Sequence, residues 1–235
     1  MSWAGRMRGR PPHQPRTGHD LNPGCQLRED AGNSQYCRPP WAGRLKEEPL
    51  SRIPLFPTGD MTPEQRRVHD AVVSGPRGEL RGPLRAVLHR PELADKWQQL
   101  GELLRFRTSL PPQLKELAIL VTGRHCHAQL EWHIHEQMAL KAGLPQAVID
   151  DVHAGRRPTA LDDDGLAVFD YAEELNRRKT VGEETYRRVL DRWQAVGAVE
   201  LTALVGYYTM VAMTLNCHDI PLPDGVPPPL PLAPE

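Results

Sequence analysis

Residues 116–143 read ELAILVTGRHCHAQLEWHIHEQMALKAG, and this stretch decides the fold. Its apolar positions continue a helical pattern that begins near Pro112. We expect a break near Gly123 and then a further helix from His127 to Ala142. Gly143 follows as a left-handed stop, a conformation that glycine adopts readily at a helix end. Two helices in succession are therefore predicted here.

Helix signals continue on both sides of this stretch. Thr62, Pro63 and Gln65 form a helix start, with a threonine cap, a proline at the first helical position and a glutamine that closes a capping box. Further helices are predicted from Pro91, with Leu93, Trp97, Leu100 and Leu104 at helical spacing, from Pro145 to Gly155, and over residues 166–178, 183–196 and 199–217. The last helix is apolar nearly all round and belongs at the centre or in an interface. No stretch alternates long enough to be a strand, so the predicted fold class is all-α, a helical bundle.

Composition divides the chain into three parts. Residues 1–60 are rich in Pro and Arg and lack apolar periodicity, so we expect a disordered extension. Two alternatives stay open for it: a basic arm that binds nucleic acid, and a mis-assigned start, with translation beginning at Met61. Residues 61–220 form the predicted helical domain. Residues 221–235 are a Pro-rich tail, which we expect to lie extended on a neighbouring surface.

Bulk properties indicate a cytoplasmic protein. The formal net charge is -1, so no overall field favours nucleic acid or a membrane surface. The longest apolar stretch, residues 201–215, is too short to cross a bilayer, and the N-terminus shows no secretory signal. The 4 cysteines show no CxxC, and unpaired thiols in a reducing compartment are expected. We expect a small-molecule substrate, with no nucleic acid and no membrane as partner.

Charged residues within the apolar helices are the first candidates for chemistry. Glu116 lies in an otherwise aliphatic segment, and a charge there is costly unless it is paired or functional. Glu131 and His135 are four residues apart, so they share a helix face and can touch. Such a pair could orient the imidazole as a proton shuttle near neutral pH. A contact that only stabilises the helix is the alternative interpretation.

Metal and thiol chemistry are less well supported. Four histidines crowd residues 125–135, but His133 and His135 point in opposed directions on a regular helix, and no HExxH pattern is present. We therefore expect no metal and no cofactor. Cys126 stands between two histidines in sequence, but adjacency in sequence is not adjacency in space, and a buried structural thiol is expected.

Three short motifs in order carry a resemblance to a known family. They are Glu116-Leu-Ala-Ile-Leu, Glu131-Trp132-x-x-His135 and Ala139-x-x-Ala142-Gly143-Leu144. Together they resemble the core motif of the carboxymuconolactone decarboxylase and alkylhydroperoxidase D-like family. The resemblance covers about residues 61–230, with Gly206-Tyr-Tyr and Leu222-Pro-Asp-Gly included. It implies an alkylhydroperoxidase D-like helical bundle that assembles into a homo-oligomer with sites near subunit boundaries.

The sequence departs from the peroxidase members of this family. In those members a glutamate is followed twelve residues later by CxxC, with a histidine four residues beyond the second cysteine. By position, the glutamate matches Glu116 and the histidine matches His135, but the cysteines fall on Ala128 and Glu131. Cys126 is two residues out of register. Neither Ala nor Glu can replace a redox thiol, so thiol peroxidase activity is not expected.

The remaining resemblance is to the lyase branch, in which an unsaturated lactone acid loses carbon dioxide. It implies that His135 delivers a proton, with Glu131 or Glu116 holding its tautomer. Arg105 and Arg107 are the nearest candidates to bind a substrate carboxylate, and Trp132 could wall the pocket. Two other functions stay open: an antioxidant that uses Cys126 with Cys217, and a non-catalytic oligomeric binding module.

Overall fold

The structure, a computed structural model, describes residues 51–55 and 61–231. Within these residues the chain forms eight helices and no strand, so the all-α prediction is confirmed. The helices are α1 (Pro63–Ser74), α2 (Pro83–Val87), α3 (Pro91–Phe106), α4 (Pro112–His125), α5 (Gln129–Lys141), α6 (Gln146–His153), α7 (Asp163–Arg178) and α8 (Glu183–Cys217). The short helix α2 has no counterpart among the predicted helices.

The predicted signals at helix ends are present. The Thr62 hydroxyl accepts from the Gln65 amide nitrogen at 3.3 Å, and the Gln65 side chain accepts from the Thr62 amide nitrogen at 2.9 Å, which completes the capping box. Gly143 and Gly155 follow α5 and α6 with φ of 91° and 70°, the left-handed conformation that ends a helix. The N-terminal prolines and these two glycines therefore set most of the helix boundaries.

The turn between α4 and α5 differs from the prediction. Gly123 remains helical, and His127 adopts the left-handed conformation instead, with φ of 51°. The Ala128 amide donates to the Gly123 carbonyl at 2.9 Å, and the His127 amide donates to the Arg124 carbonyl at 3.2 Å. These two bonds satisfy the last carbonyls of α4 and reverse the chain. Because the turn is tight, α4 and α5 pack side by side.

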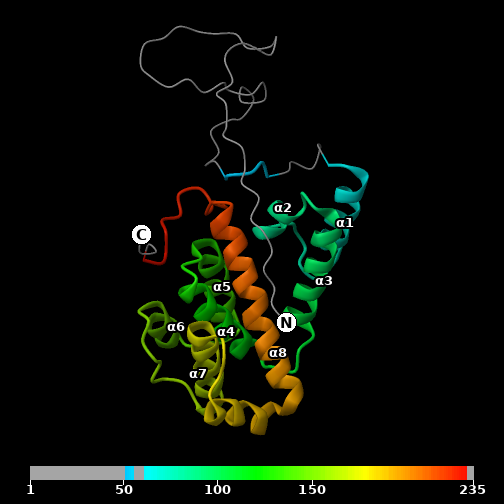
Figure 1. Ribbon diagram of the computed structural model, residues 1–235. Helices are drawn as coiled ribbons and strands as arrows, with labels where there is room; N and C mark the ends of the chain where they lie inside the picture. The colour runs from blue at the N-terminus through cyan, green and yellow to red at the C-terminus, as the bar shows by residue number, and fades with distance from the viewer. Residues whose placement is uncertain (1–50, 56–60, 232–235) are drawn as a thin grey trace, which may run out of the picture. The chain divides into compact units, whose positions relative to one another are not determined.

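Helix α4 lies at the centre of the domain. It contacts α5, α6, α7 and α8, and residues 117–123 are buried without exception. A helix that is apolar on every side is stable only where other helices cover it all round. In Figure 1, α4 to α7 lie on one side of α8, and α1 to α3 lie on the other.

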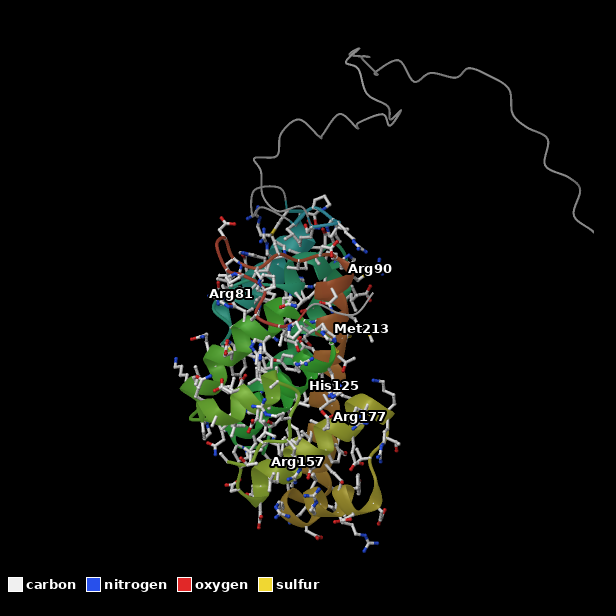
Figure 2. The ribbon with its side chains drawn as sticks, turned by 90° about the vertical axis from the view of Figure 1, so that its left-hand side faces the viewer. Arg81, Arg90, His125, Arg157, Arg177 and Met213 are labelled. Carbon is white, nitrogen blue, oxygen red and sulfur yellow. The ribbon has the colours of Figure 1, made fainter. Side chains whose placement is uncertain are left out.

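Helix α8 is two helical segments with a kink at Gln194, whose φ is 56° and ψ is -167°. The sequence predicted two helices that meet between residues 196 and 199, and the structure places this break a few residues earlier, at Gln194. By length and composition α8 could cross a membrane, but one such helix is weak evidence and half of its apolar window is buried in the domain. Its outer face includes exposed Met213, labelled in Figure 2.

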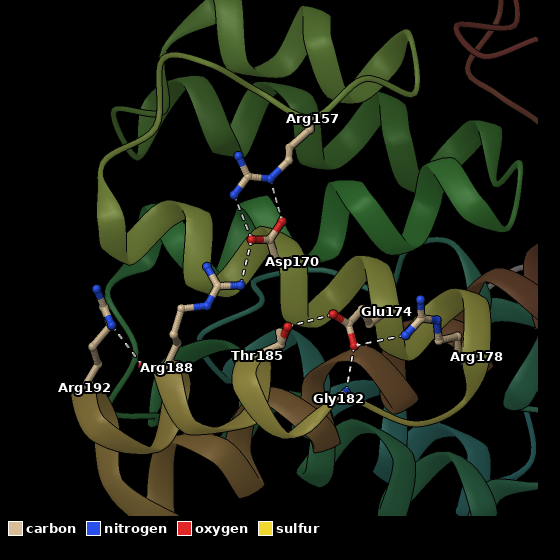
Figure 3. Close-up of polar contacts among 8 residues, drawn as sticks. All are labelled: Arg157, Asp170, Glu174, Arg178, Gly182, Thr185, Arg188 and Arg192. Carbon is tan, nitrogen blue, oxygen red and sulfur yellow. Dashed lines mark hydrogen bonds and ion pairs between the residues drawn. The ribbon is translucent and has the colours of Figure 1, made fainter.

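Ionic and polar contacts fasten the start of α8 to α7 (Figure 3). Asp170 accepts hydrogen bonds from Arg157 and Arg188, each at 2.8 Å. Glu174 accepts from the Thr185 hydroxyl and from the Gly182 amide, both at 2.7 Å. These partners come from the α6–α7 loop, from the N-cap of α8 and from α8 itself, so the two carboxylates of α7 hold the loop and the start of α8 against α7.

Both described end segments lie on the helical domain. Residues 51–55 belong to the predicted extension; Arg52 pairs with Asp219 at 2.6 Å, and the Pro54 carbonyl accepts from His89 at 2.8 Å. The expectation of disorder for the rest of residues 1–60 lies outside the described residues. In the tail, the Gln129 side chain bonds both the amide and the carbonyl of Leu230.

Candidate active site

A pocket of about 230 Å³ opens between the α1–α2 loop, the C-terminal end of α3, α5 and α8. Aliphatic and aromatic side chains form most of its wall. Its ionisable side chains, tyrosines included, are Arg77, Glu79, Arg81, Arg105, Glu131, His135, Tyr207 and Tyr208. An apolar pocket with a few convergent polar groups is the usual form of a small-molecule site.

His135 is held by Glu116 across the α4–α5 interface. Its Nδ1 lies 2.7 Å from Glu116 Oε2, so Nδ1–H donates to the carboxylate and Nε2 is the ring nitrogen left for another partner. The imidazole also stands edge-on to the Tyr208 ring, with centroids 4.9 Å apart and an interplanar angle of 87°. These contacts from α4 and α8 fix the orientation of a histidine that lines the pocket.

Glu131 has no such partner. Its side chain is 2 % exposed, and neither carboxyl oxygen has a hydrogen-bond partner among the described residues. It packs against α4 where Gly123 has no side chain, and a Cβ there would lie 3.3 Å from Oε1. Burial raises the pKa of Glu131 well above its ordinary value, because a low-dielectric surrounding disfavours the charged form. Burial therefore favours the protonated form of this carboxyl group, which can donate a hydrogen bond.

The predicted contact between Glu131 and His135 is absent. Both side chains line the pocket, but the ring nitrogen that a carboxylate would hold is taken by Glu116. Of the two candidates named for orienting the histidine, the structure selects Glu116. Glu131 thereby becomes a separate group with its own protonation state.

Of the two arginines predicted to bind substrate, only Arg105 lines the pocket. Arg105 lines the pocket, where its Nη2 lies 3.2 Å from the Met138 sulfur and its guanidinium stacks over Phe106 at 5.1 Å. It forms no ion pair with any described carboxylate. Arg107 is outside the pocket and pairs with Glu102 at 3.5 Å, because residues two apart at a helix end point in different directions.

Trp132 was expected as a possible pocket wall, and this expectation is wrong. The side chain is 0 % exposed and packs in the core, with its ring 5.4 Å from that of His153 on α6. It is adjacent to Glu131 on α5 and so points to a different side of that helix. Its role is structural.

Three pocket residues were not singled out as site residues from the sequence. Tyr207 and Tyr208 come from α8, within a Gly-Tyr-Tyr run that was noted only as part of the resemblance. Arg77 comes from the α1–α2 loop, where no periodicity marks it, and its Nη2 donates to the Tyr207 hydroxyl at 3.4 Å. The signal for the tyrosines was two consecutive rings with polar hydroxyls in a largely apolar stretch of helix.

The cysteines of the described residues are free thiols, Cys126 and Cys217. Burial raises the pKa of Cys126 to about 11. A thiol with such a pKa is a poor nucleophile at neutral pH, because the thiolate is the reactive form. Ala128 and Glu131 stand at the two positions where the resemblance implies redox cysteines, so no pair of thiols lies there.

The neighbouring histidines have separate partners. His125 bonds Glu173 at 2.7 Å, and His127 bonds the Pro231 carbonyl at 3.2 Å. Within the described part of the chain, no three His, Cys, Asp or Glu side chains come together as a metal site would need.

Comparison with known proteins agrees with this architecture. The model of the carboxymuconolactone decarboxylase family matches residues 91–174. A similar solved structure is an uncharacterised peroxidase-related protein from Ralstonia eutropha JMP134 with an alkylhydroperoxidase AhpD core. It has a TM-score of 0.63 and 15 % sequence identity, over 75 % of this chain and 94 % of that chain, so the likeness shows the fold alone. No curated protein matches the sequence.

The fold is that of an AhpD-like helical protein. Ala128 and Glu131 stand where the resemblance implies the two redox cysteines of the peroxidase members. The match of the family model over residues 91–174 and the AhpD-like fold agree with the resemblance to the carboxymuconolactone decarboxylase and alkylhydroperoxidase D-like family. The resemblance seen in the sequence is thereby confirmed.

Proposed function

We propose that this protein is a cofactor-independent, carboxy-lyase-like enzyme that acts on a small unsaturated carboxylate, such as a lactone acid. One observation carries the proposal: two acid–base groups of the same pocket have opposite surroundings, because His135 contacts a carboxylate and Glu131 has no hydrogen-bond partner among the described residues. Glu131 favours the neutral form because it is buried without a partner, whereas His135 has a carboxylate on Nδ1. Neighbouring groups whose environments separate their protonation states are typical of sites that move protons.

In the proposed reaction, the bond between the substrate carboxylate and its neighbouring carbon breaks, and carbon dioxide leaves. The electron pair passes into the conjugated carbonyl group, and neutral Glu131 donates a hydrogen bond to that oxygen. His135, as an imidazolium paired with Glu116, gives its Nε2 proton to the carbon. Solvent restores the proton, so each turnover consumes one proton and no redox step occurs.

Arg105 completes the proposed site as the anchor for a carboxylate that the substrate retains. Its guanidinium forms no ion pair with the described carboxylates, and it lines the same pocket as His135. A planar guanidinium suits a carboxylate, because two parallel N–H groups can bind both oxygens. The apolar wall would exclude water from the conjugated part of the substrate.

The test is a screen of unsaturated lactone acids, 4-carboxymuconolactone included, with release of carbon dioxide as the signal. On any substrate found, His135→Ala should lower turnover by about 10² to 10⁴-fold, the usual effect of losing a general acid or base. Glu131→Gln should be milder, since an amide N–H can still donate. Arg105→Gln should mainly raise KM.

His69→Gln is the matched control, because His69 also pairs with a carboxylate, Asp70 at 2.9 Å, but lies on α1 outside the pocket. Full activity in His135→Ala, with helicity unchanged by circular dichroism, would remove His135 from the mechanism. Glu131 and Glu116 would then be the next residues to test.

We also propose that the protein is a cytoplasmic homo-oligomer. Apolar side chains remain exposed on two helices: Leu93, Leu100, Leu103 and Phe106 on α3, and Val196, Val199 and Met213 on α8. The helical pattern of α3 comprises Leu93, Trp97, Leu100 and Leu104. Trp97 and Leu104 are buried in the core, whereas Leu93 and Leu100 are exposed. Clustered apolar side chains outside a core are typical of subunit interfaces.

A further inference from the structure

A second cleft, of about 220 Å³, lies at the C-terminal end of α4, between α6 and α7. It shares no lining residue with the active-site pocket. Its floor is apolar and consists of Val121, Val152 and Phe169. Charged groups surround this floor, so the cleft can hold a ligand with an apolar body and a charged end.

Arg124 supplies a fixed cation beside the floor. Its Nε donates to the His153 carbonyl at 2.7 Å, which anchors the guanidinium. Among the described residues no carboxylate pairs with Arg124, so its two terminal nitrogens remain for a ligand. An anchored guanidinium with two free N–H groups suits the two oxygens of a carboxylate.

Gly155 leaves space next to this guanidinium. It follows α6 with φ of 70°, and a Cβ at this position would lie 3.6 Å from Arg124 Nη2. Because Gly155 lines the cleft, a side chain there would narrow the approach to Arg124.

His125 and Glu173 form the opposite polar group. His125 Nε2 lies 2.7 Å from Glu173 Oε2, which leaves Nδ1 for another partner (His125 is labelled in Figure 2). Arg156, the other lining cation, already pairs with Asp151 at 2.7 Å. Arg124 is therefore the lining charge that the protein leaves unbalanced, and the cleft selects an anion.

We propose that this cleft binds a small monocarboxylate with an apolar body, of the aryl carboxylate class. The carboxylate lies on Arg124, and the apolar body packs on the floor formed by Val121, Val152 and Phe169. Benzoate has these two features and is the probe for the test.

Isothermal titration of the full-length protein with benzoate tests the proposal. Because benzoate could also bind Arg105 in the active-site pocket, the titration is done in the Arg105→Gln background. Adding Arg124→Gln should weaken binding by about tenfold or more, the usual effect of losing a charge-assisted hydrogen bond. Arg187→Gln is the matched control, since Arg187 is an exposed arginine on α8 that pairs with Glu183 and lies outside the cleft; it should leave affinity unchanged.

A second variant covers the case in which Arg124→Gln disturbs the end of α6. Arg156→Glu changes an exposed side chain at the rim of the cleft, and it should weaken benzoate binding several-fold by placing a negative charge there. Circular dichroism checks that the helices are retained. Benzyl alcohol, which lacks the carboxylate, should bind at least tenfold more weakly than benzoate. Equal binding of the two probes, or unchanged benzoate affinity in both cleft variants, would overturn the proposal.

Discussion

At the scale of single residues, the surroundings of two carboxyl groups decide what each can do. Glu116 accepts a hydrogen bond from an imidazole, so its charge is used to orient His135. Glu131 lies against the backbone of α4 with no donor in reach, so burial governs its protonation. Identical side chains on adjacent helices thus supply an anion and a neutral acid to one site.

The thiols offer a test at this scale. In a variant with Cys25 and Cys37 replaced by Ser, iodoacetamide at pH 8 should modify exposed Cys217 readily and Cys126 very slowly. With a pKa of about 11, only about one Cys126 thiol in a thousand is a thiolate at that pH. Mass-spectrometric mapping of the alkylated sites over time measures both rates. Equal rates would restore Cys126 as a candidate nucleophile.

Which residues line the site could be predicted from the sequence better than which of them contact one another. Spacing of four places Glu131 and His135 on one helix face, and both do line the pocket. Spacing cannot show that Glu116, nineteen residues earlier, reaches the same imidazole, because that contact depends on how α4 packs against α5. For the same reason, Arg105 and Arg107 could not be separated before the end of α3 was placed.

At the scale of helices, two glycines with opposite surroundings give a paired prediction. A Cβ on Gly101 of α3 would overlap the Tyr207 hydroxyl and the Arg77 guanidinium at the pocket. Gly206 of α8 is exposed, and apart from its chain neighbours and the adjacent backbone of α8, no described atom lies within 4 Å of its Cβ position. Gly101→Ala should therefore destabilise by about 1–3 kcal/mol through overpacking. Gly206→Ala should stabilise by up to about 1 kcal/mol through helix propensity.

Urea denaturation of both variants beside the wild type measures the two effects. They should have opposite signs although the substitution is the same. A more stable Gly101→Ala protein would show that Tyr207 and Arg77 can move away from α3 without loss.

The kink in α8 gives a second prediction for a helix. Gln194 occupies a backbone region that is essentially restricted to glycine, at a cost of about 1–3 kcal/mol. Gln194→Gly should raise the free energy of unfolding by about 1 kcal/mol, after allowing for the greater freedom of glycine in the unfolded chain. Gln194→Ala should bring no gain, because alanine keeps the Cβ that causes the strain. Chemical denaturation separates these outcomes, and an equal gain in both variants would argue against strain.

Most helices could be predicted because their ends carry local signals, such as Thr62 with Gln65 or the stop at Gly143. The turn after α4 could not, because Gly123 looks like a helix end but is needed where Glu131 packs against the helix. The left-handed position goes to His127 instead, although glycine adopts this conformation more readily than histidine does. Tertiary packing overrides the local signal at this turn.

At the scale of the whole molecule, the exposed apolar residues of α3 and α8 predict self-association. Light scattering coupled to size exclusion should give a mass that is a multiple of 26.4 kDa. Leu103→Glu or Val199→Glu should shift the protein toward a monomer without loss of helicity, because a buried charge destabilises an interface. A monomeric wild type would refute the predicted assembly, and it would leave the proposed chemistry of the pocket unaffected.

The central claim, that Glu131 is a neutral acid in the folded protein, has a consequence for global stability. A carboxyl group whose pKa is raised on folding binds its proton more tightly in the native state than in the unfolded state. The stability of the wild type should therefore fall as the pH rises above the ordinary carboxyl value of 4.5, until the native-state pKa is passed. Glu131→Gln has no proton to lose and lacks this contribution.

The decisive measurement is the free energy of unfolding of the wild type and of Glu131→Gln, determined by urea denaturation at several pH values from 4.5 upward. We predict that the free energy of unfolding of Glu131→Gln rises relative to that of the wild type as the pH rises, by up to about 1.4 kcal/mol per pH unit within this window. A difference that stays constant with pH, or one that shifts in favour of the wild type, would show that Glu131 is not held neutral and would contradict the account.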